Sequence, residues 1–419
     1  MNITIHPKFL AGTVQAISSK SYSHRYVIAA ALANGKSHIH NVLLSDDLSA
    51  TIDGLSSLGA QFEGDSIIGN YPKAVRKEIS CKESGSTLRF LIPLALLTEK
   101  EMMFSGDGRL PQRPLNIYED MFKQKNIDYK KTTNHHLPML IKGPLHSGIY
   151  HMKGNVSSQF ISGLLFALPL LKGDSKIILE PPIESKDYIL MTIDVLQKFG
   201  VDVKYEHHTI SVFGNQSYHP IEISIEGDYS QAAFWMVAGT IGKSIKISGL
   251  DPHSIQGDKK IVELIQSMGG SIVFDEYDKF YDIQPMKTKG MTIDLSQIPD
   301  LGPILMILAA LSEGTSTFTG IERLRLKESN RLDAMIEVLE SFGVNVVLEE
   351  DILYITGQQE LKGNKIISSF HDHRIAMAIA IGSIRAQGSI TIIDAEVVKK
   401  SYPDFFDTYE KLGGIIDVY

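Results

Sequence analysis

An internal repeat sets the architecture of this 419-residue chain. A strand follows a glycine, and then come a polar loop, an amphipathic helix that ends at another glycine, and a pair of strands. In the copy that begins at Gly242, Ile261, Leu264, Ile265 and Met268 recur at helical spacing before the next glycine. Further copies begin at Gly35, Gly173, Gly314 and Gly388, and a degenerate copy has its strand at 102–104 and its helix at 117–122. The copies recur roughly every 70 residues, the kind of period that marks a repeat architecture.

Six copies predict two globular domains of three copies each, because a chain of this length exceeds one ordinary core. Single strands and hairpins, such as 201–204 followed by 209–212, favour mixed or antiparallel sheets over one open parallel sheet. The N-terminal strand is expected to complete the C-terminal domain. The expected domains are therefore 1–18 plus 227–419, and an inserted domain 19–226, joined by two linkers near Ser18 and near 226–228.

Composition excludes several classes of protein. The formal charge of −8 argues against a nucleic-acid binder with a broad basic face. The single cysteine, Cys81, rules out an internal disulfide and a Cys-based zinc site, and it suits a reducing cytoplasm. The longest apolar run, 160–171, is shorter than the roughly 20 residues of a membrane span. Residues 1–6 alternate like a strand, so no signal peptide is expected.

Hydroxyl-rich and basic residues precede an apolar run at 18–25. Four serines, Lys20 and Arg25 open the expected helix that continues to Leu32. Such a segment caps the free N–H groups of a helix, and with the positive end of the helix dipole it can hold an anion. Taken alone, the segment favours a solvated helix cap with two surface cations, because short motifs often occur by chance.

Similar loops recur at the same phase of the repeat, and together they indicate an anion-binding site. They lie at 83–89, 108–114, 155–160, 327–331, 371–374 and 399–403. Each alone is compatible with a helix cap or a surface charge cluster. A metal site at His371 and His373 is disfavoured by the i, i+2 spacing and the adjacent Arg374. No Gly-x-Ser-x-Gly elbow or Walker loop is present, which disfavours a serine hydrolase and a Walker-type ATPase.

These motifs resemble, in order and spacing, those of the 5-enolpyruvylshikimate-3-phosphate synthase family. The resemblance spans nearly the whole chain and rests on the motifs Ser19-Lys20-Ser21, Gly85-Ser86-Thr87-Leu88-Arg89, Gly108-Arg109, Arg113-Pro114, Ser157-Ser158-Gln159, Lys327-Glu328-Ser329, Asp372-His373-Arg374 and Lys400-Ser401-Tyr402-Pro403. It implies an α/β (α+β) fold, a two-domain inside-out α/β barrel in which each domain has three βαβαββ units and the active site lies in the cleft between the domains.

The resemblance also implies an activity and a set of site residues. The family transfers the enolpyruvyl group of phosphoenolpyruvate to the 5-hydroxyl of shikimate 3-phosphate by addition and elimination, in aromatic amino acid biosynthesis, and it is the target of glyphosate. Catalytic groups would be Lys20, Asp300 and Glu328. Shikimate 3-phosphate would be held by Lys20, Ser21, Arg25, Ser157, Ser158, Gln159, Ser185, Asp300 and Lys327. Phosphoenolpyruvate would be held by Lys20, Gly85, Arg113, Gln159, Arg331, Arg374 and Lys400. We expect a cytoplasmic monomer with no metal, cofactor, nucleic acid or membrane partner.

The chain departs from the common family pattern at several positions. Glu83-Ser84, Asp187, Arg323, Asn330 and His371 stand where other residues are frequent. These departures leave the charged catalytic groups in place, so we expect them to affect affinity more than activity. Because Gly85 is kept, we expect glyphosate to bind.

Two alternatives stay open from sequence. One is the sister enolpyruvyl transferase that acts on a UDP-amino sugar, although Lys20 is followed here by serine rather than asparagine and Cys81 lies outside any comparable loop. The other is an inactive anion-binding protein of the same fold.

Overall fold

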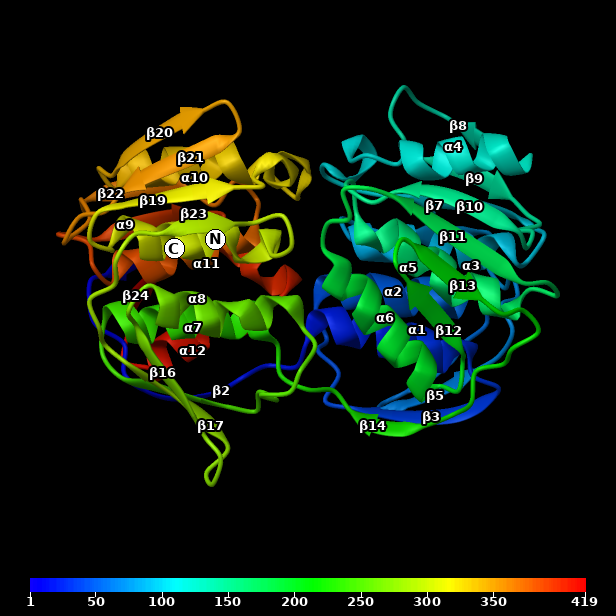
Figure 1. The fold of residues 1–419 in the computed structure, drawn as a ribbon, viewed down its shortest axis with the longest axis horizontal. Helices are drawn as coiled ribbons and strands as arrows, with labels where there is room; N and C mark the ends of the chain where they lie inside the picture. The colour runs from blue at the N-terminus through cyan, green and yellow to red at the C-terminus, as the bar shows by residue number, and fades with distance from the viewer. The chain divides into compact units, whose positions relative to one another are not determined.

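The computed structural model describes residues 1–419, and these residues divide into two compact units (Figure 1). Unit 1 comprises Met1–Ser19 and Glu226–Tyr419, and unit 2 comprises Lys20–Ile225. Each unit has its own hydrophobic core. The chain therefore passes between the units twice, after Ser19 and after Ile225.

Each unit contains three four-stranded sheets, and all six sheets have the same topology. The first strand pairs parallel with the second, the second antiparallel with the third, and the third antiparallel with the fourth. The unit 2 sheets, in spatial order, are β14 (Glu222–Ser224), β3 (Gly35–His40), β5 (Ser66–Gly69), β4 (Gln61–Glu63); β6 (Glu78–Ser80), β7 (Glu101–Ser105), β9 (Met139–Lys142), β8 (Asp128–Lys131); and β10 (Ile149–Lys153), β11 (Ser175–Glu180), β13 (Thr209–Val212), β12 (Val203–Glu206).

Unit 1 repeats this plan. Its sheets are β2 (Gly12–Gln15), β15 (Ile245–Ser248), β17 (Phe280–Gln284), β16 (Ser271–Asp275); β18 (Thr292–Asp294), β19 (Thr315–Thr319), β21 (Ile352–Thr356), β20 (Asn345–Glu349); and β22 (Lys365–Ser368), β23 (Ile390–Ile393), β1 (Ile3–His6), β24 (Ile415–Val418). Hydrogen bonding does not continue from one sheet to the next, so the expected inside-out barrel consists of separate sheets.

Three strands are far in sequence from the sheets that they complete. β1 lies between β23 and β24 in the last sheet of unit 1. β2 comes just before the first helix of unit 2 in the chain, but it pairs with β15 of unit 1. Conversely, β14 comes just before the first helix of unit 1, but it pairs with β3 of unit 2. Each unit thus takes one strand from the segment that leads into the other.

Each sheet belongs to one βαβαββ repeat, as expected. The predicted strands that follow Gly35, Gly173, Gly242, Gly314 and Gly388 are β3, β11, β15, β19 and β23, and the degenerate strand is β7. In the degenerate copy the helix ends at Asn126, whose φ of 52° is left-handed, so asparagine takes the place that glycine has elsewhere. The repeat prediction is confirmed, and the substitution explains why this copy is hard to see.

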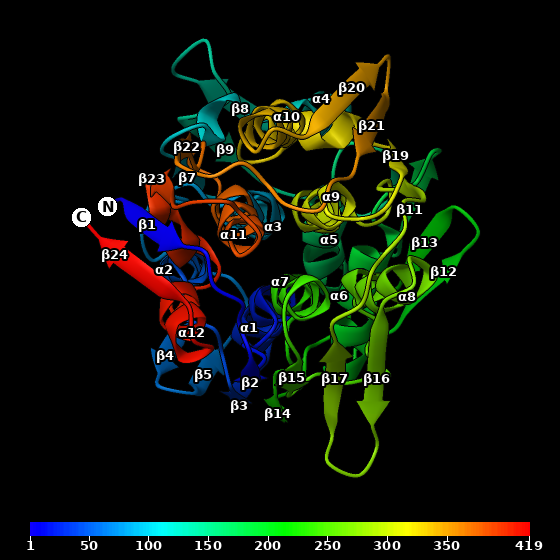
Figure 2. The same cartoon turned by 90° about the vertical axis from the view of Figure 1, so that its left-hand side faces the viewer.

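The helices are of two kinds. The buried helices are α1 (Lys20–Leu32), α3 (Gly85–Leu96) and α5 (Ser158–Ala167) in unit 2, and α7 (Tyr229–Ile241), α9 (Gly302–Ala310) and α11 (His373–Ser383) in unit 1. The other helices bury one face: α2 (Asp46–Ser57), α4 (Asn116–Lys125), α6 (Lys186–Lys198), α8 (Lys260–Ser267), α10 (Arg331–Ser341) and α12 (Phe405–Lys411). Helices α7, α9 and α11 pack against one another inside unit 1 (Figure 2).

Short 3₁₀ segments connect several of these elements. They are η1 (Leu110–Gln112), η2 (Leu168–Leu170), η3 (Gly257–Lys259), η4 (Pro299–Leu301), η5 (Glu322–Leu326) and η6 (Ala395–Lys400). The longest helices have 13 residues, and none is long and apolar enough to cross a membrane.

Candidate active site

The predicted anion-binding loops lie mainly where the buried helices begin. Lys20, Gly85 and Ser158 are the first residues of α1, α3 and α5, and His373 is the first residue of α11. Asp300 lies in η4, directly before α9. The N–H groups at a helix start carry partial positive charge and favour anions. The repeat therefore places the predicted site residues at equivalent ends of equivalent helices.

At the start of α1, a carboxylate holds the catalytic candidate Lys20. Its Nζ lies 2.5 Å from Oδ2 of Asp47 in α2, and both side chains are mostly buried. Arg25, one turn later, donates to the hydroxyl of Thr192 and to the carbonyls of Ser21 and Tyr188. Burial lowers the pKa of Arg25 to about 10. Arg25 is thus fixed by neutral groups, which leave its charge available to an anion.

At the start of α3, Gly85 allows two guanidinium groups to approach the backbone. A Cβ at this position would lie 2.8 Å from Nη1 of Arg113 and 2.9 Å from Nη1 of Arg89. Ser84 caps the helix by accepting from the N–H of Thr87 at 3.1 Å. The residue that departs from the family pattern here therefore makes an ordinary N-cap.

At the start of α5, the side chain of Gln159 is held at both ends. Its Oε1 accepts from Nη1 of Arg89 at 2.6 Å, and its Nε2 donates to Oγ of Ser86 at 2.8 Å. Ser157 caps the helix and accepts from the N–H of Gln159. Gln159 and Gly85 are thus linked through Arg89. Ser185, before α6, is buried and has a left-handed φ of 52°.

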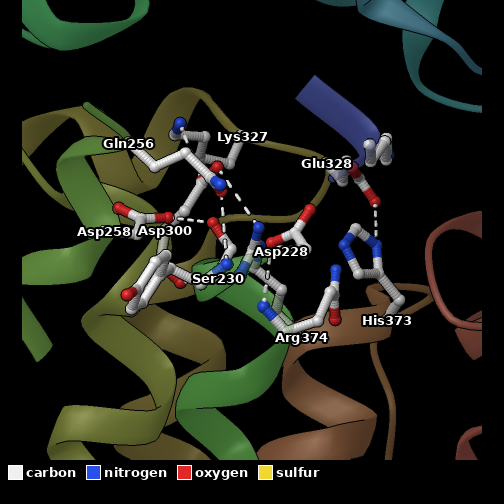
Figure 3. A network of polar contacts seen from close by, with 12 residues as sticks. Asp228, Ser230, Gln256, Asp258, Asp300, Lys327, Glu328, His373 and Arg374 are labelled. Atoms are coloured by element: carbon white, nitrogen blue, oxygen red, sulfur yellow. Dashed lines mark hydrogen bonds and ion pairs between the residues drawn. The ribbon is translucent and has the colours of Figure 1, made fainter. Parts of the chain in front are cut away.

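In unit 1, Asp300 is the centre of a group of charged side chains that we call the Asp300 cluster: Asp300, Lys327, Glu328, Arg331, Asp372, His373 and Arg374. Oδ1 of Asp300 lies 3.1 Å from Nζ of Lys327 and 2.8 Å from Nη1 of Arg331. Arg374 donates to the Asp300 carbonyl at 3.1 Å and lies 3.4 Å from Oδ2 (Figure 3). Five of the predicted site residues therefore lie in this cluster: Asp300, Lys327, Glu328, Arg331 and Arg374.

Charge compensation decides the protonation states in the Asp300 cluster. Burial alone would raise the pKa of Asp300, but Arg374, Lys327 and Arg331 outweigh it and hold that pKa well below the usual range. Burial, assisted by Arg323 and Arg331, lowers the pKa of Lys327 to about 8, although Asp300 opposes the shift. Asp300 is thus an ionised base, and Lys327 titrates near neutral pH.

A second carboxylate fixes the other side of Arg331. Asp372 Oδ2 accepts from Nε of Arg331 at 2.7 Å and from Oγ of Ser329 at 3.1 Å, and Oδ1 accepts from the N–H of Arg374 at 3.0 Å. Both side chains are almost inaccessible to solvent. The pKa of Asp372 would rise on burial, but Arg331 lowers it.

Glu328 is oriented by His373, whose Nδ1 lies 2.9 Å from Oε2 (Figure 3). Possible metal-ligand atoms of Glu328, Asp372 and His373 lie within 4.8 Å of one another. Since the Asp372 oxygens already accept from Arg331, a cation here would have to compete with a guanidinium. The two histidines considered for a metal site do not converge, because the His371 side chain is 80% exposed and the His373 side chain only 2%.

The remaining predicted residues lie around the cluster. Lys400, at the end of η6, donates to the His371 carbonyl at 3.4 Å. Arg323 is buried in η5 and lies near Lys327. Asn330 caps α10 by accepting from the N–H of Asp333. The departures at Asn330 and His371 thus occupy structural positions beside the predicted binding groups.

Sequence reasoning missed the residues that hold the predicted ones. Asp47 pairs with Lys20, Arg89 with Gln159, Asp372 with Arg331, and His373 with Glu328. Arg89, Asp372 and His373 stand inside the motifs already recognised. A buried cation needs a counter-charge, so the acidic residue Asp372 in the Arg374 motif could have been predicted from sequence to pair with a buried arginine. Asp47 had no such signal, because it is brought to Lys20 only by the packing of α2 on α1.

Comparison with known proteins agrees with this arrangement. The sequence profile of "EPSP synthase (3-phosphoshikimate 1-carboxyvinyltransferase)" matches residues 5–409. A 3-phosphoshikimate 1-carboxyvinyltransferase of Clostridium kluyveri is 47% identical over 99% of this chain and 98% of its own length, and one of Clostridioides difficile is 41% identical over 99% and 98%. An EPSP synthase structure from Acinetobacter baumannii superimposes with a TM-score of 0.84 at 26% identity, covering 100% of this chain and 99% of that one.

A more distant structure shares the fold alone. The enolpyruvyl transferase NikO of Streptomyces tendae superimposes with a TM-score of 0.81 at 17% identity, over 99% of this chain and 98% of its own. The full-length profile match and the 47% identity decide the family. The chain belongs to the EPSP synthase family and is an enzyme that transfers the enolpyruvyl group of phosphoenolpyruvate to shikimate 3-phosphate.

Proposed function

We propose that the two units act on the same pair of substrates, with cations of both units binding their anionic groups and with Asp300, Glu328 and Lys20 moving protons. The observation that carries this proposal is the Asp300 cluster, in which a partly buried carboxylate contacts three cations while a second carboxylate, Glu328, bonds His373. Both substrates carry a phosphate and a carboxylate. Arginine and lysine groups that converge in this way suit such ligands.

For shikimate 3-phosphate, the proposed binding groups are Lys20, Ser21, Arg25, Ser157, Ser158, Gln159, Ser185, Asp300 and Lys327. For phosphoenolpyruvate, they are Lys20, Gly85, Arg113, Gln159, Arg331, Arg374 and Lys400. Fixed geometry supports this assignment at several positions, since Arg25 and Gln159 are already held by protein groups before any ligand binds. Pre-organised groups lose less entropy on binding.

In the addition step, the 5-hydroxyl oxygen bonds to C2 of phosphoenolpyruvate and its proton passes to Asp300. A proton from Lys20 or Glu328 is added to the methylene carbon, which gives a tetrahedral ketal phosphate. In the elimination step, the group that gave this proton takes one back from the new methyl group, the C–O bond to phosphate breaks, and phosphate departs with the proton that Asp300 had accepted. Each transfer needs a positioned acid or base.

Substrate charge would adjust the basicity of Asp300. Without ligand, Arg374, Lys327 and Arg331 hold the pKa of Asp300 well below its usual range. Substrate phosphate and carboxylate groups that pair with these cations would offset their effect, and the proton affinity of Asp300 would rise. Asp300 would thus become a competent base when the site is filled.

The test is phosphate release with both substrates and with each omitted in turn. Release that needs both substrates and is lost in Asp300→Ala supports the proposal. Release with a UDP-amino sugar in place of shikimate 3-phosphate would instead assign the protein to the enolpyruvyl transferases that act on UDP-amino sugars. Release by Asp300→Ala at the wild-type rate would remove Asp300 from the mechanism.

We also propose that the protein is a cytoplasmic monomer inhibited by glyphosate. The single cysteine is buried, and burial raises the pKa of its thiol, so Cys81 is protected from oxidation. Gly85 retains the space beside Arg113 that an anionic inhibitor would share with phosphoenolpyruvate. Size-exclusion chromatography with light scattering tests the monomer, and inhibition that competes with phosphoenolpyruvate tests the inhibitor.

A further inference from the structure

The two segments through which the chain passes between units are bonded to each other within unit 1. We call residues 17–19 and 226–229 the crossover segments. Ser18 and Gly227 form an antiparallel bridge. The N–H of Ser19 donates to the Glu226 carbonyl at 2.8 Å, and the N–H of Asp228 donates to the Ile17 carbonyl at 2.8 Å. Movement of one segment is therefore coupled to movement of the other.

A buried glutamine bonds both crossover segments. Gln256 is 6% exposed. Its Oε1 lies 3.3 Å from Oγ of Ser19 and 3.2 Å from the N–H nitrogen of Tyr229, and it accepts from both. Its Nε2 donates to Oε1 of Glu226 at 2.6 Å and to the Gly227 carbonyl at 2.7 Å. A carboxamide has two donors and two acceptor sites, so all four are used.

The same loop reaches the Asp300 cluster. Two residues later, the buried carboxylate of Asp258 accepts from Oγ of Ser230 in the first turn of α7. Burial and the nearby charge of Asp300 raise the pKa of Asp258 to about 6. Figure 3 shows Gln256, Asp258 and Ser230 in one network with Asp300 and Arg374. The crossover segments, the start of α7 and the cluster are thus connected through three consecutive residues.

We propose that Gln256 is a positioning residue that fixes the two crossover segments to each other, and with them the backbone that leads to Lys20 at the start of α1 and the backbone at the start of α7. The first crossover segment leads directly to Lys20, and the second leads into α7. A glutamine suits this position because its oxygen accepts from Ser19 while its nitrogen donates to Glu226. This inference rests on the proposed sharing of substrates by the two units.

The test variant is Gln256→Glu in the full chain. It keeps the shape of the side chain but turns two donors into acceptors that face the Glu226 carboxylate and the Gly227 carbonyl. Adding Glu226→Gln restores a donor–acceptor pair across the same contact. The matched control is Gln358→Glu. Gln358 is a partly buried glutamine of unit 1, outside the crossover segments, and its side chain donates to the Phe342 carbonyl at 3.2 Å.

Three properties are measured: kcat/KM for phosphate release, the rate of hydrogen exchange at the backbone N–H groups of Ser19 and Asp228, which bond across the crossover segments, and the melting temperature. We expect Gln256→Glu to lower kcat/KM about tenfold or more, as the loss of a charge-assisted bond does, and to speed hydrogen exchange at the N–H groups of Ser19 and Asp228. The double variant should reverse most of both changes. Gln358→Glu should match the wild type in all three.

Three results would overturn the proposal. They are a wild-type kcat/KM per folded molecule in Gln256→Glu, activity loss without rescue by Glu226→Gln, and wild-type rates of hydrogen exchange at Ser19 and Asp228 in Gln256→Glu. If Gln256→Glu does not fold, Gln256→Met, which removes the four bonds without adding charge, is held to the same criteria. An inactive wild type would instead contradict the catalytic proposal, so the two failures are distinguishable.

Discussion

The two units use charge differently at equivalent helix starts. In unit 1, charged groups bond to one another: Arg331 contacts both Asp300 and Asp372, and Lys327 contacts Asp300. In unit 2, Arg25 bonds a hydroxyl and two carbonyls, and Arg89 bonds the Gln159 amide and a carbonyl. The same repeat thus carries a network of ion pairs in unit 1, whereas in unit 2 Lys20 pairs with the Asp47 carboxylate and Arg25 is held by a hydroxyl and two carbonyls.

The difference teaches which chemistry each unit can supply. A carboxylate surrounded by cations changes its proton affinity when those cations gain or lose other partners, which suits acid–base catalysis. A guanidinium held by neutral groups keeps its positive charge and its orientation, which suits anion binding. Four predictions test this comparison, beginning with the largest expected effect.

Removing the central carboxylate should abolish most activity. Asp300→Asn keeps the shape but removes the base and leaves Lys327, Arg331 and Arg374 without their shared counter-charge. We expect kcat to fall by about 10³-fold, within the range for loss of a general base. Phosphate release measures this, and circular dichroism verifies folding. A kcat within tenfold of wild type would contradict the proton-transfer role of unit 1.

Breaking one ion pair in each unit should have unequal costs. Asp372→Asn leaves the buried Arg331 uncompensated on one side and should cost about 3 kcal/mol of unfolding free energy. Asp47→Asn affects the more accessible Lys20 pair, whose side chains are 17% and 11% exposed, and should cost about 1 kcal/mol. Urea unfolding compares the two variants. Equal losses would show that the units do not differ as proposed.

Crowding the cations of unit 2 should weaken substrate binding more than turnover. In Gly85→Ala the new methyl group would lie within 3 Å of Arg113 and Arg89 nitrogens. We expect the KM for phosphoenolpyruvate to rise about tenfold, the effect of displacing one charged hydrogen bond. The control is Gly64→Ala, at a β-turn with φ of 60° and nothing within 4 Å, where stability falls but KM should not change. An unchanged KM in Gly85→Ala would separate Gly85 from the site.

The alkaline limb of the pH profile should report Lys327. Its pKa of about 8 means that the ammonium group loses its proton, and its attraction for an anion, as the pH rises through 8. The value of kcat/KM should therefore fall about tenfold per pH unit well above 8. In Lys327→Arg the charge persists, so the limb should move to higher pH. If the fall in kcat/KM of this variant occurs at the same pH as in the wild type, the titrating group is not Lys327.

Much of this protein was predictable from sequence because the determining interactions are local. Glycine at helix ends, apolar spacing along each amphipathic helix and hydroxyl-rich helix caps predicted the six repeats and the loops that carry Lys20, Gly85, Ser157, Lys327 and Arg374. The order of those motifs indicated the family. One copy of the repeat was harder to recognise, because its helix ends at Asn126 rather than at a glycine. Asparagine adopts the left-handed conformation less often than glycine, but it does so here.

The partners of these residues were decided only by tertiary structure. Asp47 reaches Lys20 because α2 packs on α1, and Gln256 reaches both Ser19 and Glu226 because β2 pairs with β15, which lies more than 200 residues further along the chain. Long-range pairs leave no periodic trace in the sequence, since their spacing depends on which strand completes which sheet. The sequence by itself thus determined the repeat and the charged groups, whereas packing decided which of those groups are held by carboxylates and which by neutral atoms.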